Sequence, residues 1–461
     1  MRFLHTTLVV ALGLATLVPG RAFAGGFEVP DQSAVAGATG GAGTARRGDP
    51  SSAWYQPAET ADGRGFRGAL GLALAIPTIT AEGLEDPMET ASTVTAVSPP
   101  PHLHLSYSEN EWSVGAYIGL SHGSSVNWPD GWWGRFESMQ TGIIGIRAAP
   151  FFALRLGGER GLIEGFPDIR ISIGAHVDTV RVEQARMLDF IDQEGRVQLL
   201  FWGAGVGGDA SVYYQATPEL AFGVTYKSRT WMRMNGDADF TVPDAFVGRA
   251  PDQHATTELT IPDRLVLGFG YQEGMFGVWA DFGVTFWSVR QRTQVDFERD
   301  VTSDIDTPSN WHDAIALRLG GEVSPIPEIH ARAGLFFDQE VGPDDTLAAS
   351  SPDMARLGVT LGAGFDITRE LGVDLYYSYV AFLGRDSTSL DAALAHYSGE
   401  LHLVGLTVRL VVDSGPPQAD AVAEPEPEVV DPLDEPPDPQ VEGSDESVGT
   451  DDGDDEEEPA Y

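Results

Sequence analysis

The sequence predicts an all-β protein, a fourteen-stranded antiparallel transmembrane β-barrel that is followed by a disordered acidic C-terminal tail. Three observations lead to this fold class. The 461-residue chain opens with an export signal, and its body alternates apolar with small or polar residues in segments of roughly ten residues. Short and long connections also alternate between these segments. Because lipid offers no hydrogen bonds, only a closed barrel satisfies the edges of such a sheet in a membrane.

Residues 1–24 have the pattern of a secretory signal peptide. Arg2 supplies the positive start, Thr7–Val18 is a short apolar run, and an A-x-A cleavage site ends at Ala24. The apolar run is shorter than the roughly 20 residues that a spanning helix needs. Cleavage would leave Gly25 as the first residue of the mature chain. No later stretch is long and apolar enough to predict a helical membrane protein.

Fourteen segments with a two-residue period follow. From Ile169 to Val177, for example, the odd positions are apolar and the even positions include Arg170 and His176. A soluble sandwich would alternate in the same way, but charge is nearly absent from the presumed outer faces, which favours the membrane barrel. The predicted strands are approximately 66–76, 101–108, 111–121, 141–156, 168–181, 197–215, 219–239, 255–271, 275–296, 310–323, 328–338, 354–366, 371–384 and 398–412.

The long connections lie at alternate ends of these strands, as surface loops do in outer-membrane barrels, whereas the periplasmic turns are short. An even number of strands therefore puts both ends of the barrel on the periplasmic side. The long loops are 77–100, 122–140, 182–196, 240–254, 297–309, 339–353 and 385–397.

Charge and cysteine content exclude several classes of function. The chain has 28 Lys and Arg against 69 Asp and Glu, a net charge of −41, which argues against nucleic-acid binding. It contains no cysteine, so disulfides, thiolate zinc sites and cysteine nucleophiles are absent. Residues 413–461 carry 19 of the acids and no base, with many prolines, which predicts a disordered periplasmic tail.

Several short motifs share the order and spacing of one known family. The stretch GGFEVPDQSAVAGATGGAGTARRGDPSSAWYQPA starts the mature chain, and Ile261-Pro262-Asp263, Phe286-Trp287-Ser288, Trp311-His312-Asp313-Ala314, the Arg332–Asp338 segment and the Pro352–Arg356 segment follow. With these motifs the chain resembles the FadL/TodX outer-membrane transporters of long-chain fatty acids and other hydrophobic compounds, over roughly residues 25–412.

The resemblance implies a plugged barrel. Residues 25–65 would form an N-terminal hatch inside the barrel of residues 66–412. The hatch motif reads Gln56-Pro57-Ala58, whereas the family has Asn-Pro-Ala. Glutamine keeps the amide and adds a methylene, so a cap or turn made by asparagine could change.

The resemblance also implies what the protein does. It would take up hydrophobic compounds, foremost long-chain fatty acids, by surface capture, hatch-gated passage and lateral release through the barrel wall. Release is expected at strand 111–121, where Gly115 and Gly119 permit a bulge. The chain would be a monomer of the bacterial outer membrane, without enzyme activity, cofactor or metal.

Two surface loops are candidates for capture of the substrate. Met187, Leu188, Phe190 and Ile191 would lie exposed on a short helix within Glu183–Asp192, and Phe246 would join them from loop 240–254. The alternative is that these side chains pack loop against loop. Loop 122–140 also holds a tryptophan cluster, Trp128, Trp132 and Trp133, which is more typical of an interfacial aromatic belt.

Three cations are candidates for contact with a substrate carboxylate. Strand parity places Lys227, the only lysine of the chain, and Arg229 on the inner face, and Arg332 also points inward. Arginine suits bidentate pairing with a carboxylate. The alternative is that lumenal arginines pair with lumenal acids such as Asp281 or Asp338.

The last strand, Leu403–Leu410, resembles the signal that outer-membrane barrels present to the barrel assembly machinery. That machinery and outer-membrane lipids are therefore expected partners. Rival functions stay open: a general or substrate-specific porin, an uptake channel for aromatic hydrocarbons, or a structural surface protein. A lipid hydrolase or metal enzyme is disfavoured, because neither G-x-S-x-G nor H-E-x-x-H occurs.

Overall fold

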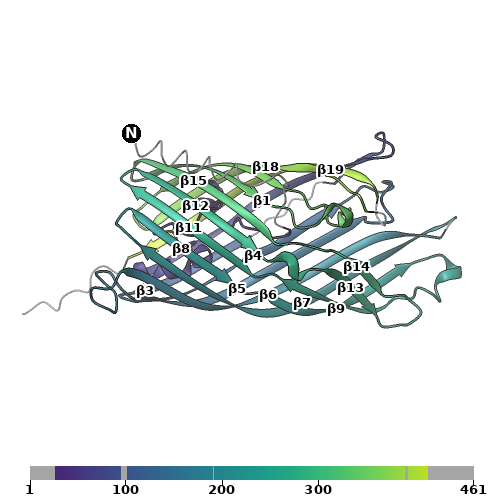
Figure 1. Cartoon of the computed structure of the whole chain (residues 1–461), viewed down its shortest axis with the longest axis horizontal. Helices are drawn as coiled ribbons and strands as arrows, with labels where there is room; N and C mark the ends of the chain where they lie inside the picture. Colours follow the sequence, from purple (N-terminus) through teal and green to yellow (C-terminus); the bar gives the residue numbers. More distant parts are fainter. Residues whose placement is uncertain (1–25, 95–100, 191, 390–392, 414–461) are drawn as a thin grey trace, which may run out of the picture. The chain divides into compact units, whose positions relative to one another are not determined.

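The barrel is one antiparallel sheet that closes on itself, as the computed structural model shows (Figure 1). The structure describes residues 26–94, 101–190, 192–389 and 393–413, so the predicted signal peptide and all but the first residue of the predicted tail lie outside it. Closure comes from the pairing of β1 (Gly65–Gly83) with β19 (Ala395–Val412), which runs from Phe66–Val412 to Gly83–Ala395. No helix in the described ranges is long and apolar enough to cross a membrane.

The strands of the wall occupy fourteen positions, which confirms the predicted number. At four of these positions the strand is split into two shorter strands. The remaining strands are β2 (Thr90–Ser92), β3 (Pro101–Glu109), β4 (Trp112–Asn127), β5 (Gln140–Arg155), β6 (Asp168–Asp189), β7 (Glu194–Gln215), β8 (Leu220–Lys227) with β9 (Thr230–Thr241), β10 (Gln253–Ile261) with β11 (Arg264–Glu273), β12 (Phe276–Thr285) with β13 (Arg292–Phe297), β14 (Ile305–Pro308) with β15 (Ala314–Ile326), β16 (Ile329–Asp338), β17 (Arg356–Asp366) and β18 (Leu371–Asp386). The short β2 is a branch of the first long loop, paired with β1.

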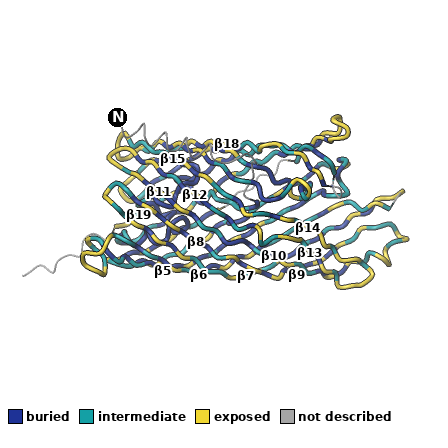
Figure 2. Tube along the Cα trace, in the orientation of Figure 1, coloured by how far each residue is buried: buried dark blue, intermediate teal, exposed yellow. Residues whose placement is uncertain are grey.

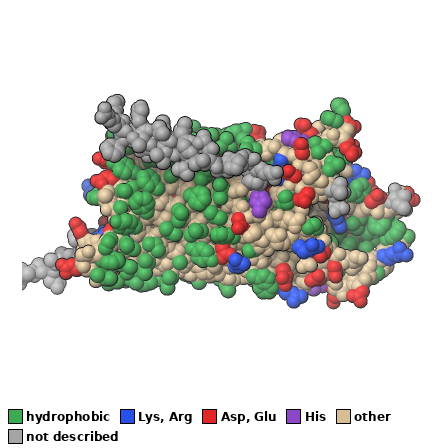
Figure 3. Space-filling view, in the orientation of Figure 1, with side chains coloured by type: hydrophobic (Ala, Val, Ile, Leu, Met, Phe, Trp, Pro, Cys, Tyr) green, Lys and Arg blue, Asp and Glu red, His purple; other side chains and the backbone are tan. Residues whose placement is uncertain are grey.

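The alternation of apolar and polar residues predicted from the sequence is confirmed in the wall, where apolar side chains face outward and polar side chains face inward. Ile173 is 68% exposed and Val206 is 73% exposed on the outer face, whereas Arg170 and His176 point inward and are buried. Buried and more exposed residues alternate along the wall strands (Figure 2). On the face drawn in Figure 3, hydrophobic side chains gather over the part of the wall nearest the short turns, and charged side chains gather toward the other end. Such an apolar surface is explained by contact with lipid.

Two adjacent wall strands break at the same level. The chain leaves the ladder at Ser228-Arg229, between β8 and β9, and at Pro262-Asp263, between β10 and β11. Proline has no N–H to donate, so it suits a break in the ladder. The Asp263 carboxylate accepts hydrogen bonds from the Arg229 backbone N–H at 3.1 Å and from the Tyr226 hydroxyl at 2.6 Å, which ties the two breaks together.

Residues 26–64, which belong to the segment predicted to be the hatch, lie within the barrel and are almost wholly buried. They contain helix α2 (Ala34–Ala38), helix α3 (Ser52–Tyr55) and the 3-10 helix η1 (Pro57–Asp62). Small side chains let these turns approach the wall: a Cβ added at Gly37 would come within 2.8 Å of the Tyr376 ring. Ser33 caps α2 by accepting a hydrogen bond from the Ala36 N–H at 3.0 Å.

The extracellular loops depart from two predictions. The described residues of Glu183–Asp192 form no helix, because β6 continues to Asp189 and forms a long hairpin with β7. The cross-strand pairing thus outweighs the local helical pattern. Trp128 and Trp132 are both 4% exposed and stack on each other at 4.4 Å beneath the loops, so the expected lipid-facing aromatic belt is wrong for them.

Candidate functional site

The upper lumen holds a packed cluster of apolar side chains, which is called the chamber cluster. Phe27 of the hatch meets Trp287 of the 3-10 helix η3 (Trp287–Val289) at a ring distance of 4.7 Å, and Trp287 meets Trp311 at 5.1 Å. Wall side chains complete the cluster, among them Phe201, Met232, Met234, Leu259, Ile261 and Val295. Aromatic rings and methionines provide an adaptable apolar surface for a hydrophobic ligand.

The first hatch segment sits on the edge of β4. The Val29 N–H donates to the Ser121 carbonyl at 3.0 Å, and the Gly123 N–H donates to the Phe27 carbonyl at 2.8 Å. This contact follows directly on the end of the β3–β4 ladder, whose last pair is His102 with Gly119. Beyond this pair, the hatch therefore takes the place of β3 as the hydrogen-bonding neighbour of β4.

Strand β4 contains a β-bulge, as predicted, but the bulge lies at a different residue. The register with β5 shifts between Leu120 and His122, so the bulge is at Ser121 rather than at Gly115 or Gly119. Gly119 instead makes room for the hatch, because a Cβ there would lie 2.5 Å from the Gln32 side-chain oxygen. Gly115 faces the wall itself, where a Cβ would lie 2.5 Å from the Leu105 carbonyl oxygen.

Lys227 lies inside the barrel, as strand parity predicts. Its Nζ atom lies 3.3 Å from the centroid of the Trp54 ring and 4.9 Å from that of Tyr117. This buried amine has no hydrogen-bond acceptor among the described residues. A cation held only by aromatic faces keeps its N–H groups available for an anion.

Two small cavities of about 20 Å³ flank the Lys227 amine. Both are lined by Lys227, Trp54 and Arg264. Each is large enough for a water molecule and far too small for a lipid. The hatch residue Trp54 lines both cavities.

The neighbouring arginines differ from Lys227, because each is paired with an acid. Arg264 pairs with Glu28. Arg318 pairs with Asp338 at 2.5 Å, and Arg147 donates two hydrogen bonds to Asp178. The predicted alternative, in which lumenal arginines pair with lumenal acids, is confirmed for these residues.

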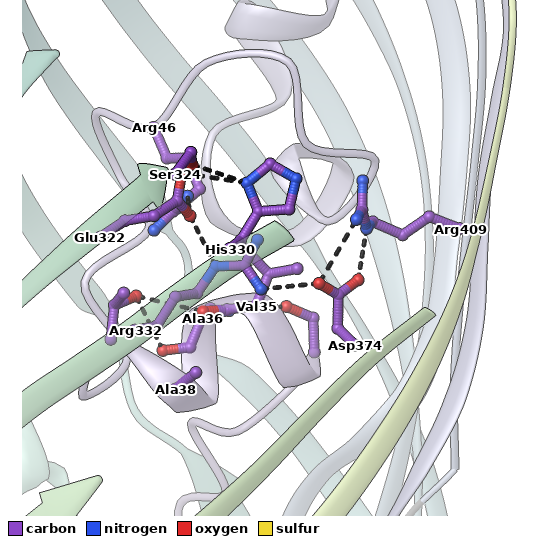
Figure 4. A network of polar contacts seen from close by, with 12 residues as sticks. Val35, Ala36, Ala38, Arg46, Glu322, Ser324, His330, Arg332, Asp374 and Arg409 are labelled. Atoms are coloured by element: carbon purple, nitrogen blue, oxygen red, sulfur yellow. Dashed lines mark hydrogen bonds and ion pairs between the residues drawn. The ribbon is translucent and has the colours of Figure 1, made fainter. Parts of the chain in front are cut away.

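A buried ion network fastens the hatch to the wall (Figure 4). The Arg46 guanidinium stacks on the Trp279 ring at 3.6 Å and donates to Glu322 at 3.0 Å. Glu322 also accepts from Arg332 at 2.5 Å, and Arg332 donates to Asp374 at 2.6 Å. Arg332, a candidate for substrate contact, is therefore held by two acids.

Further contacts anchor the hatch nearer the periplasmic end. Asp62 pairs with Arg155 at 2.6 Å. In the predicted hatch motif, the Gln56 side chain donates to the Val212 carbonyl at 3.0 Å and the Ala58 N–H donates to the Ser211 hydroxyl at 3.0 Å. Pro57 starts η1, a position that suits its missing N–H.

The loop of residues 339–353 covers the chamber from the extracellular side. Val341 is fully buried in the chamber cluster, and the Asp353 carboxylate accepts a hydrogen bond from its N–H at 2.5 Å. Arg385 of β18 donates to the Gly342 carbonyl at 2.9 Å. Burial raises the pKa of Glu340 to about 7, although the nearby Arg385 charge opposes this shift.

Arg229 is wrongly predicted to face inward: its side chain is 58% exposed and pairs with Asp263 at 2.6 Å, because the chain leaves the ladder at the preceding residue. Phe190 and Phe246 contact each other at 4.4 Å, at the outer ends of two loops.

The remaining loop candidates lie near the two apolar clusters. Leu188 packs against the chamber cluster and Met187 against the tryptophan cluster. These contacts agree with the alternative in which the loop side chains pack against one another. Ile191 lies outside the described residues.

Sequence reasoning missed the chamber residues Phe27, Trp287, Arg290 and Trp311. They belong to the hatch and to connections between strands, where a two-residue period says nothing about direction. The family-like motifs around Trp287 and Trp311 were the available signal. In the described part of the chain, no group of three or more acidic or histidine side chains is arranged to hold a metal ion.

Comparison with known proteins identifies the family. The model of the outer membrane protein transport protein family (OMPP1/FadL/TodX) matches residues 15–404. Outer membrane protein P1 of Haemophilus influenzae is 30% identical over 217 residues, which cover 44% of this chain and 46% of that protein. The chain thus spans about half the length of the curated relatives it matches.

Solved structures share the fold. A FadL homologue of Pseudomonas aeruginosa has a TM-score of 0.74 at 16% identity, covering 84% of this chain and 99% of that one. The toluene transporter TodX of Pseudomonas putida has a TM-score of 0.64 at 16% identity, covering 83% and 98%. These relatives are outer-membrane proteins and transporters, in agreement with the predicted location and with the expectation that the chain is not an enzyme. The chain belongs to the outer membrane protein transport protein family, OMPP1/FadL/TodX.

Proposed function

We propose that the protein takes up hydrophobic carboxylic acids, foremost long-chain fatty acids, across the outer membrane. The single observation that carries this proposal is the buried Lys227 amine, which has no acceptor among the described residues and lies beside the plug. The apolar side chains of the chamber cluster above it suit an alkyl chain, since each buried methylene contributes about 0.8 kcal/mol.

Passage would be gated by the first hatch segment rather than by loss of the whole plug. Phe27 fills the chamber, and the backbone contacts of Phe27 and Val29 join it to β4. The rest of the hatch is fixed by Arg46 and Asp62 through buried or partly buried ion pairs. A ligand that displaces the first segment would leave these anchors in place.

Lateral release through the wall at β4 is supported by the same contacts. Beyond the His102–Gly119 pair, the edge of β4 is bonded to the hatch instead of to β3. Moving the hatch segment would expose backbone groups of β4 next to the bulge at Ser121. A hydrophobic ligand could then leave sideways into lipid, where its chain is soluble.

Capture at the surface would begin on the extracellular hairpins. The contacting pair of Phe190 and Phe246 presents aromatic surface at the outer ends of two loops, and Met187 and Leu188 continue it toward the lumen. The protein would act as a monomer, assembled by the barrel assembly machinery and surrounded by outer-membrane lipids.

Mass spectrometry of lipophiles that copurify with the protein tests the proposal. We expect long-chain acids with the full-length chain and their loss from a variant that lacks residues 25–65. Recovery of neutral aromatic compounds instead would favour an aromatic hydrocarbon channel, the function that the names of TodX and its relatives suggest. Large steady conductance without bound lipophiles would favour a porin.

A further inference from the structure

The turn between β5 and β6 is much longer than the other described turns at the same end of the barrel. It spans residues 156–167, whereas the others are residues 110–111, 216–219, 274–275, 327–328 and 367–370. It presents three large apolar side chains, because Leu162 is 57% exposed, Ile163 is 50% exposed and Phe166 is 39% exposed. Exposed apolar side chains gathered on one short segment indicate a contact surface.

This β5–β6 turn has a compact fold of its own. Gly158 lies in the left-handed region at a φ of 76°. At Gly161 an added Cβ would come within 2.3 Å of the Gly157 carbonyl oxygen, so the backbone folds closely back on itself. The exposure of the apolar side chains is therefore a property of a defined structure, as in a compact surface loop.

The backbone donors of the exposed apolar residues are satisfied within the protein. The Leu162 N–H donates to the Arg155 carbonyl at 3.2 Å, and the Ile163 N–H donates to the Leu156 carbonyl at 2.8 Å. The Phe166 N–H donates to the Ile163 carbonyl at 3.2 Å. These groups need no water, which is the condition that lipid imposes on a backbone.

The polarity of the turn is the reverse of that expected in water, where charged side chains are exposed and apolar ones are buried. Arg160 reaches the hatch, and its Nη2 atom donates to the Asp62 carbonyl at 2.9 Å and to the Asp62 carboxylate at 3.0 Å. The apolar side chains stay exposed instead, together with Glu159 and Glu164. Such a mixture suits the boundary between lipid and water.

The apolar outer face of the β5–β6 hairpin continues to this turn. Phe152 of β5 is in register with Ile173 of β6, and both are exposed on the outer face. Leu154 is in register with Ile171 one level closer to the turn. The Leu156 N–H then donates to the Ile169 carbonyl at 2.8 Å, where the turn begins. The exposed side chains of the turn therefore extend the lipid-facing surface of the wall.

We infer that Leu162, Ile163 and Phe166 insert into the periplasmic leaflet of the outer membrane, among the phospholipid acyl chains next to the headgroups. The end of the barrel with the short turns is the periplasmic end in barrels of this class. The inference concerns the lipid around the barrel, so it holds whichever compound the protein carries.

Fluorescence quenching tests this contact, because the chain has no cysteine that would compete for a label. Ile163→Cys, and separately Phe166→Cys, is labelled with the environment-sensitive fluorophore NBD in the purified full-length protein. Each variant is placed singly in nanodiscs of phosphatidylethanolamine and phosphatidylglycerol. We expect a large loss of fluorescence with lipids that carry a nitroxide near the top of the acyl chain, and little loss with aqueous iodide.

Two further label positions calibrate the result. Ile173→Cys, on the outer face of the wall, should be quenched by the nitroxide lipid and protected from iodide. Pro218→Cys, exposed at the tip of the short turn of residues 216–219, should show the reverse. The altered mobility of folded barrels in unheated gel samples establishes that each variant is folded.

The results at the two turn positions decide the inference. Labels at residues 163 and 166 that behave like the label at residue 173 support insertion into the leaflet. Labels there that are quenched by iodide and not by the nitroxide lipid, as at residue 218, would overturn it. Protection from both quenchers would also overturn it, because it would mean that protein rather than lipid covers the turn.

Discussion

The Nζ atom of Lys227, on wall strand β8, lies 3.3 Å from the ring centroid of Trp54, on hatch helix α3. One cation–π contact thus joins the wall to the hatch inside the barrel. Because the amine has no acceptor among the described residues, this contact leaves its donors free for a ligand. A carboxylate that reached the amine would meet the plug at the same point.

Lys227→Met should separate the binding role of this amine from any structural role. Methionine has a similar length and removes an unpaired buried donor, so we expect normal assembly. Oleate uptake should fall about tenfold, since a hydrogen bond to a charged group contributes about 1.5–3 kcal/mol. Arg229→Gln, on the outer face, is the control and should take up oleate normally. Wild-type uptake by Lys227→Met would contradict this role.

Gly119→Val should impair passage at the β4 edge. The new side chain would enter the space of the Gln32 amide, which donates to the Leu120 carbonyl at 2.7 Å. We expect lower oleate uptake with normal barrel assembly. Gly142→Val on neighbouring β5 is a matched control, because no atom lies within 4 Å of the added Cβ. Equal uptake by the two variants would argue against release at β4.

Arg46→Gln should loosen the plug without unfolding the barrel. The change removes the ion pair with Glu322 and the stacking on Trp279. The cost should not exceed about 3 kcal/mol, because Glu322 keeps its contact with Arg332. We expect brief conductance steps in planar bilayers that the wild-type protein lacks. Arg135→Gln removes a more exposed ion pair on a surface loop and should leave the bilayer silent.

The pattern of the strands was sufficient to predict the barrel, and it failed where the chain leaves the ladder. Parity placed Lys227 correctly inside the wall, whereas the break at Ser228 turned Arg229 outward. A hairpin of β6 and β7 forms where a helix was expected. The helical pattern is local, whereas the hairpin is stabilised by pairing along the whole length of two strands. The chamber cluster depends on rings brought together from the hatch and two connections, which no local pattern contains.

Acidic pH should tighten the extracellular loop of residues 339–353. The pKa of Glu340 is raised from its ordinary 4.5 to about 7, first by burial, with Asp353 and Asp344 adding to the shift and Arg385 opposing it. Closure therefore binds a proton, so the closed loop gains stability as pH falls from above 7 toward 4.5. Hydrogen exchange of the loop, corrected for intrinsic rates, should be slower at pH 5.5 than at pH 8.

Glu340→Gln provides the control for this pH dependence. The amide resembles the protonated acid, so the loop of this variant should exchange slowly at both pH values. A wild-type loop that exchanges faster at pH 5.5 than at pH 8 would have the opposite sign to the one expected from a raised carboxyl pKa.

Uptake of labelled oleate and of a small polar solute by cells that express the protein, in a host without its own fatty-acid transporter, tests the central claim most directly. A plugged barrel that carries hydrophobic acids should give saturable oleate uptake and no gain in permeability to the polar solute. Free entry of the polar solute without oleate uptake would contradict the account.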